Sequence, residues 1–159
     1  MSTALQSPLK KLPDQFNASN IEELQFQAVS KDGARIPYFV VRSKSTNDAP
    51  VPTLMYGYGG FEIPILPTYM AVTGVTWLEK GFCYVVANIR GGGEFGPKWH
   101  QAALKENRNK AYEDFIAVAE DIIERKITTT KQLGIRGGSN GGLLMGNMFV
   151  LRPDLFGAV

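Results

Sequence analysis

The stretch that decides the fold of this chain is Gly137-Gly138-Ser139-Asn140-Gly141-Gly142-Leu143-Leu144. Gly137 and Gly141 bracket Ser139 in the pattern G-x-S-x-G, the spacing of a nucleophile elbow, which is a tight turn between a strand and a helix. A short apolar run precedes the motif at 132–136, and a longer one follows at 143–151. Side chains in place of these glycines would collide with the flanking strand and helix. The motif therefore predicts Ser139 at a helix N-terminus, hydroxyl outward, where developing negative charge is stabilised.

Other chemistries fit the sequence less well. A phosphate-binding loop also joins a strand to a helix, but it ends in Gly-Lys-Ser/Thr, and no lysine adjoins Ser139. Cys83 lies in an apolar run, so we interpret it as a buried, inert thiol rather than a nucleophile. One cysteine and one histidine, His100, cannot supply a zinc ligand set. We expect no metal and no cofactor.

The composition is that of an ordinary globular domain. The chain has 159 residues, of which 44% are hydrophobic and 20% charged, and its net charge is +2. This balance does not indicate binding to nucleic acid or to an anionic membrane. Residues 1–12 lack the apolar core of a signal peptide, and no run is long enough to span a membrane. We therefore expect a cytoplasmic protein, with residues 1–20 as a polar tail or linker and 21–159 as one folded unit.

Strand and helix patterns alternate along residues 21–159. The run 109–126 gives the clearest helix, with apolar side chains at i, i+3 and i+4 and the acidic ones, Asp114 among them, on the other side. The expected order is a hairpin (21–30 and 36–41), strand 53–57, helix 69–80, strand 82–87, helix 109–126, strand 133–136, the elbow, and a helix ending near 152. This order predicts the front half of an α/β-hydrolase fold, a mostly parallel sheet with an antiparallel hairpin on one edge, truncated after the elbow helix.

Five motifs in this order resemble the prolyl oligopeptidase family of serine peptidases. They run from about residue 21 to residue 159: Ser30-Lys31-Asp32-Gly33 with Ile36-Pro37, Tyr56-Gly57-Tyr58-Gly59-Gly60-Phe61, Ala87-Asn88-Ile89-Arg90-Gly91-Gly92-Gly93-Glu94-Phe95-Gly96 with Trp99-His100, the elbow, and Arg152-Pro153-Asp154-Leu155-Phe156. The elbow and Gly59-Gly60-Phe61 are closer to the prolyl-specific branch than to oligopeptidase B.

The resemblance implies roles for four residues. Ser139 would be the acylating nucleophile, the backbone N–H of Asn140 and the hydroxyl of Tyr58 would form the oxyanion hole, and Phe61 would line the pocket for the proline ring of a short peptide substrate. From the residues alone, a packed aromatic is the favoured reading of Tyr58, and a core aromatic remains open for Phe61.

The glycine-rich loop 90–97, with His100 shortly after it, carries charged and polar side chains that we interpret as structural. His100 precedes the serine, whereas α/β-hydrolases follow the order Ser, Asp/Glu, His, so we interpret it as a structural hydrogen-bonding residue. Arg90 and Glu94 resemble charges that fix a loop.

The sequence departs from the family after the elbow. Only 20 residues follow Ser139, with Asp154 in a turn and no histidine. A serine without a base is a weak nucleophile, so we expect this chain alone to be nearly inactive. Two alternatives stay open: an esterase or acylaminoacyl-peptidase-like hydrolase on the same fold, and a non-catalytic remnant. The sequence does not indicate the oligomeric state.

Overall fold

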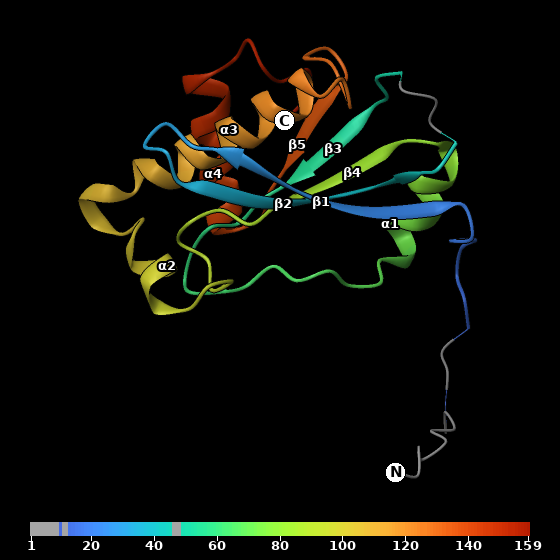
Figure 1. The fold of residues 1–159 in the computed structure, drawn as a ribbon, viewed down its shortest axis with the longest axis horizontal. Helices are drawn as coiled ribbons and strands as arrows, with labels where there is room; N and C mark the ends of the chain where they lie inside the picture. The colour runs from blue at the N-terminus through green and yellow to red at the C-terminus, as the bar shows by residue number, and fades with distance from the viewer. Residues whose placement is uncertain (1–9, 11–12, 46–48) are drawn as a thin grey trace.

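One five-stranded sheet organises the chain. The computed structural model describes residues 10, 13–45 and 49–159, and the sheet has the order β1-β2-β4-β3-β5 (Figure 1). The strands are β1 (Ile21–Val29), β2 (Arg35–Ser43), β3 (Thr53–Tyr56), β4 (Cys83–Ala87) and β5 (Leu133–Arg136). β1 and β2 form the predicted antiparallel hairpin, and β2 pairs antiparallel with β4. β3 runs parallel to β4 and β5, so the sheet is mixed, and its parallel half leads into the elbow.

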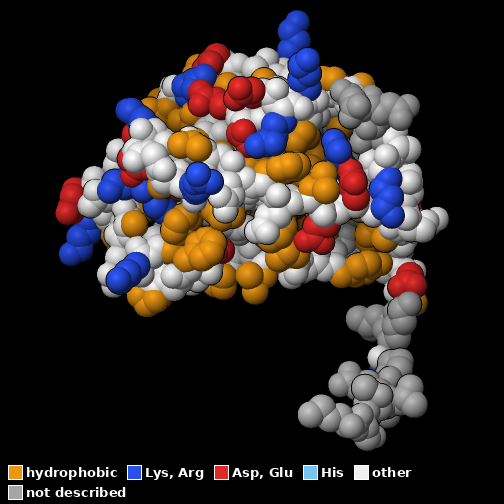
Figure 2. Space-filling view, in the orientation of Figure 1, with side chains coloured by type: hydrophobic (Ala, Val, Ile, Leu, Met, Phe, Trp, Pro, Cys, Tyr) orange, Lys and Arg blue, Asp and Glu red, His pale blue; other side chains and the backbone are white. Residues whose placement is uncertain are grey.

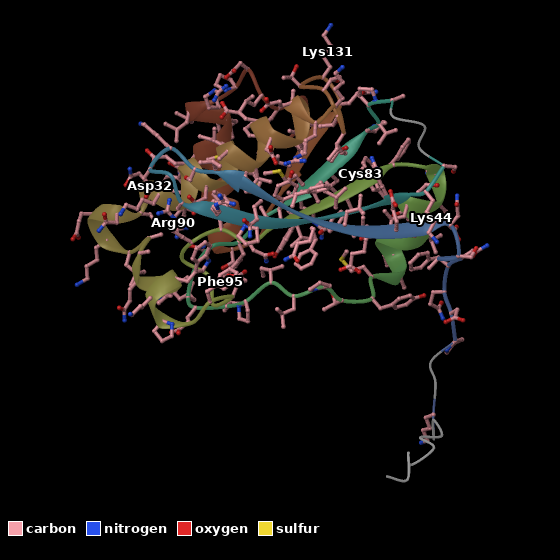
Figure 3. All side chains as sticks on the ribbon, viewed as in Figure 1. Asp32, Lys44, Cys83, Arg90, Phe95 and Lys131 are labelled. Carbon is pink, nitrogen blue, oxygen red and sulfur yellow. The ribbon has the colours of Figure 1, made fainter. Side chains whose placement is uncertain are left out.

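β4 is the central strand, and all five of its residues are buried. A strand covered on both faces reads as a continuous apolar run, which is how the sequence marks it. Cys83 opens this strand with no exposed surface (Figure 3), and burial raises the pKa of its thiol to about 12. The predicted burial of Cys83 is confirmed, and its inertness stays a prediction.

The helices are shorter and more numerous than the sequence predicts. They are α1 (Ala71–Thr76), the 3₁₀ turn η1 (Leu78–Lys80), α2 (Pro97–Gln101), the 3₁₀ turn η2 (Lys105–Asn107), α3 (Asn109–Glu124) and α4 (Asn140–Leu151). The prediction of a single helix over 69–80 is therefore wrong, because α1 ends at Thr76 and a separate 3₁₀ turn follows. The β-branched residues of α1 have low helix propensity, and one of them, Val75, is exposed. α2 and η2 are too short to show a periodic pattern.

The two faces of the sheet carry separate apolar clusters. α3 and α4 cover one face, where Phe115 and Leu144 are fully buried together with strand residues such as Met55. α1 and η1 lie against the other face, where Leu78 packs with Tyr84 and Val86 of β4. In the part of the chain that the structure describes, every helix is too short or too polar to cross a membrane.

The predicted tail contacts the folded unit where the structure describes it. The Phe16 ring stacks on Tyr69 with centroids 5.3 Å apart, and the Asn17 N–H donates to the Glu79 carboxylate at 2.9 Å. Residues 1–9 and 11–12 of this segment lie outside the described residues. The division into a tail and one folded unit stays a prediction.

Exposed hydrophobic side chains of the described residues gather on the segment 61–70 and on helix α4. The segment 61–70 runs along the lower margin of Figure 1, where Figure 2 shows hydrophobic side chains gathered, and it contributes Phe61, Ile63, Leu66 and Tyr69. Helix α4 is apolar on all sides, and its outer side exposes Leu143, Phe149, Val150 and Leu151. A helix that is hydrophobic all round is typical of the interior of a large protein.

Candidate active site

The elbow has the predicted geometry. β5 ends at Arg136, α4 begins at Asn140, and Ser139 between them has φ 55° and ψ −118° with its side chain exposed. A residue other than glycine in this region costs about 1–3 kcal/mol and persists only where the surroundings enforce it. A Cβ on Gly141 would lie 2.8 Å from the Gly57 carbonyl oxygen, so the elbow lies directly against the end of β3.

Asn140 links the elbow to the loop that follows β3. As the first residue of α4, it has a backbone N–H that no carbonyl within the helix can accept. Its side-chain Nδ2 donates to the Tyr58 carbonyl oxygen at 2.6 Å. Its Oδ1 accepts from Arg108 Nη2 at 3.3 Å. The N–H is therefore available at the positive end of a helix, as an oxyanion donor must be.

Tyr58 lies beside the elbow. The residue is half-buried, and its Cδ2 atom lies 3.7 Å from the point that a Cβ on Gly141 would occupy. The structure thus brings together Ser139, Asn140 and Tyr58, which the sequence predicts as one site. The roles of nucleophile and oxyanion donors stay predictions.

Phe61 stands on the surface of the same loop. Its side chain is 73% exposed, so the reading of Phe61 as a core residue is wrong for this chain. Phe61 and Glu62 both have positive φ, at 53° and 55°, and the Glu62 N–H donates to the Gly91 carbonyl oxygen at 3.3 Å. The strained turn presents an exposed aromatic ring in the loop that also holds Tyr58, and its role as a pocket wall stays a prediction.

His100 has the expected structural contact. Its Nδ1 lies 2.7 Å from the Gly91 carbonyl oxygen and 3.1 Å from the Glu62 nitrogen. Protonated at Nδ1, the ring donates the shorter bond to Gly91, and Glu62 then donates to the same carbonyl. His100 therefore ties α2 to the glycine-rich loop.

The prediction that Asp114 lies on the polar side of α3 is wrong, because its side chain has no exposed surface. Its Oδ2 accepts from Arg90 Nε at 2.9 Å, and its Oδ1 accepts from Arg90 Nη2 and from Ser30 Oγ, both at 2.6 Å. A signal was present, because Asp114 stands three residues after Ala111 and four before Val118, both buried on this face. Carboxylates usually face water, but Asp114 is buried because the Arg90 guanidinium pairs with its charge.

Arg90 is the hub of this network. Besides Asp114 it binds Asp32 of the β1–β2 turn through Nη1 at 2.6 Å, and the two labelled residues lie together at one end of the sheet in Figure 3. The hydrogen bonds that Arg90 donates to Asp114 raise the pKa of Arg90, and the hydrogen bonds that it donates to Asp32 lower the pKa of Asp32. Glu94 fixes the other half of the loop, since its Oε1 accepts from the Ile65 N–H at 3.0 Å. The expectation that Arg90 and Glu94 fix a loop is confirmed.

Known proteins match this chain across most of its length. An uncharacterized peptidase of Sinorhizobium fredii is 57% identical over 148 residues, 92% of this chain and 20% of that protein. A prolyl endopeptidase of Elizabethkingia miricola is 40% identical over 141 residues, 88% of this chain and 20% of that protein. Among solved structures, a post-proline cleaving enzyme from Rickettsia typhi superposes with a TM-score of 0.88 at 43% identity, covering 97% of this chain and 22% of that one.

The chain spans about a fifth of the length of the curated relatives it matches. A family model described as the prolyl oligopeptidase family matches residues 69–159, more than half of the chain and the part that holds the elbow. The sheet order, the strained serine and the family match agree, and the chain belongs to the prolyl oligopeptidase family.

Proposed function

We propose that this chain supplies the nucleophile and oxyanion hole of a serine-type oligopeptidase that cleaves short peptides after proline. The observation that carries the proposal is the strained, exposed Ser139 at the start of α4, whose neighbour Asn140 is hydrogen-bonded through its side chain to the Tyr58 carbonyl oxygen. Two similar proteins, a prolyl endopeptidase and a post-proline cleaving enzyme, support the same reaction class.

The proposed chemistry is acyl transfer. Ser139 Oγ attacks the carbonyl carbon of the proline residue, and its proton passes to a histidine base, which later protonates the leaving amine. The carbonyl oxygen becomes an oxyanion that accepts hydrogen bonds from the Asn140 N–H and the Tyr58 hydroxyl. Each such donor lowers the barrier by about 3–4 kcal/mol, because the charge that it meets develops only in the transition state. Water then releases the acyl group.

The base is not among these 159 residues. The one histidine of the sequence is His100, and its Nδ1 is engaged at the Gly91 carbonyl. The proposal therefore assigns the base and its orienting carboxylate to residues outside these 159. By themselves, the 159 residues should show little turnover, since a serine and an oxyanion hole without a base keep only a small part of the rate.

Proline selectivity is assigned to Phe61. An exposed aromatic ring on this strained turn can pack against one face of a pyrrolidine ring. The cytoplasmic location and the absence of nucleic-acid and membrane partners, expected from the sequence, belong to this proposal and can be tested by cell fractionation.

The test begins with the coding sequence after Val159. A frame that continues to an aspartate and then a histidine supports the peptidase, whereas a stop codon favours the non-catalytic remnant. The complete polypeptide should then hydrolyse a chromogenic peptide with proline at the cleavage site, and Ser139→Ala should abolish this turnover. Equal rates on an alanine peptide, or hydrolysis of an ester or an acylated amino acid only, would favour the esterase or acylaminoacyl-peptidase instead. Robust turnover by the 159-residue chain alone would overturn the requirement for a further base.

A further inference from the structure

The two proposed oxyanion donors come from different loops. Asn140 belongs to α4, while Tyr58 follows β3, 82 residues earlier in the chain. A direct hydrogen bond joins the loops, from Asn140 Nδ2 to the Tyr58 carbonyl oxygen at 2.6 Å. The Asn140 side chain thus sets the separation between its own N–H and Tyr58.

Arg108 holds both sides of this junction. It stands immediately before α3, and its Nη1 donates to the Gly59 carbonyl oxygen while its Nη2 donates to Asn140 Oδ1 at 3.3 Å. The guanidinium carbon lies 5.4 Å from the centre of the Tyr112 ring, which favours this position. Neither acceptor is charged, so the guanidinium acts here as a rigid fork rather than as an ion-pair partner.

Gly60 makes the junction tight. A Cβ at Gly60 would lie 2.8 Å from Asn140 Cγ and closer still to Nδ2, so no larger residue fits without displacing the carboxamide. The Asn140 amide is therefore enclosed by the loop backbone on one side and by Arg108 on the other, and it has one orientation that satisfies both bonds.

We propose that Arg108 and the Asn140 side chain form a clamp that aligns the oxyanion hole, which makes Arg108 a positioning residue for the reaction. This inference rests on the proposed function. Arg108 acts on the reacting atoms only through Asn140 and Gly59. Loss of the clamp should leave substrate binding intact and slow acyl transfer, because a misplacement of about 1 Å can cost roughly 100-fold in rate.

The experiment compares Arg108→Met with the wild type in the complete polypeptide. Methionine keeps an apolar stem and removes every donor. We expect kcat per active site to fall roughly 10- to 100-fold, while KM for the proline peptide stays within about twofold because uniform binding is untouched. The inhibition constant of a peptide aldehyde, whose adduct places an oxyanion in the hole, should rise in parallel with the loss of kcat/KM. Active sites are counted with a fluorophosphonate, so a lower yield of folded enzyme does not mimic the effect.

Two further variants complete the test. Arg108→Lys keeps the charge but cannot reach both acceptors as a fork, so its kcat should lie between those of the wild type and Arg108→Met. Arg125→Met, at the other end of α3, removes an arginine from the exposed pair with Asp121 and should keep kcat within about twofold of the wild type, since such surface pairs contribute little.

The outcomes separate the clamp from the function on which it rests. If the wild type shows neither turnover nor labelling of Ser139 by the fluorophosphonate, the proposed function is refuted. If the wild type is active and Arg108→Met keeps its kcat per active site, only the clamp is refuted. If Arg108→Met does not fold, Asn140→Ala, which keeps the N–H and deletes the carboxamide, should show the same loss of kcat at unchanged KM, and unchanged kcat would again refute the clamp.

Discussion

We expect Asp114→Asn to destabilise the chain by about 3 kcal/mol, at the lower end of the 3–5 kcal/mol typical of a broken buried ion pair. The carboxylate has no exposed surface and accepts four hydrogen bonds: from the N–H, Nε and Nη2 of Arg90 and from the hydroxyl of Ser30. Asparagine keeps the shape but only one acceptor oxygen, so its NH₂ group must face N–H or O–H donors. Asp32 still pairs with Arg90, which is why we take the lower figure.

Urea unfolding at pH 7, followed by far-UV circular dichroism, measures this loss. The midpoint should fall with an unchanged m-value, and the melting temperature should drop by roughly 6–12 °C, at about 2–4 °C per kcal/mol for a chain of this size. Glu113→Gln is the matched control, since Glu113 is the adjacent helix residue and its ion pair is at the surface. Lys31 Nζ lies 3.5 Å from Glu113 Oε1, and the Lys31 side chain is 80% exposed. That change should cost less than about 1 kcal/mol.

Equal losses for the two variants would refute the assignment of Asp114 to the core. A second check replaces the pair: Arg90→Met with Asp114→Leu should recover part of the stability lost in Asp114→Asn, because well-packed apolar residues can substitute for a buried ion pair. A double variant that is less stable than Asp114→Asn would mean that the network does more than satisfy its own charges.

Three further predictions concern the loops and the central strand. Gly60→Ala should lower the kcat of the complete polypeptide and change its KM less, because the new Cβ displaces the Asn140 carboxamide. An unchanged kcat in steady-state kinetics would contradict the tight junction. Asp32→Asn should flatten the acid side of the stability curve. The pKa of Asp32 is held below its ordinary 3.8 by Arg90, so the unfolded state binds more protons, and the stability present above that pH is lost as the pH falls through the lowered value. Urea midpoints between pH 7 and pH 2 test this, and parallel curves for variant and wild type would argue against it. Cys83 should resist iodoacetamide at pH 8 in the native chain and react in urea, since the thiol is fully buried with a pKa of about 12; fast native labelling, seen by mass spectrometry, would show that β4 opens.

The periodicity of apolar residues and the spacing of glycines were sufficient to predict most of the strands, the longest helix and the turn at Ser139. The alternation of strands and helices predicted the hairpin, the parallel strands and α3, because side-chain period follows backbone geometry within a few residues. G-x-S-x-G predicted the turn at Ser139, because only glycines allow the strand and helix to approach so closely. The motifs also identified the family, which the comparisons show independently.

Contacts between distant residues could not be read in this way. The sequence put Asp114 on the polar side of α3, because a lone carboxylate prefers water and its partner, Arg90, is 24 residues away. It gave no reason to select Arg108, whose acceptors at Gly59 and Asn140 lie 49 and 32 residues away. Local sequence determines which backbone shapes are accessible, whereas the partner that satisfies a buried charge or amide is determined only when the sheet brings the loops together.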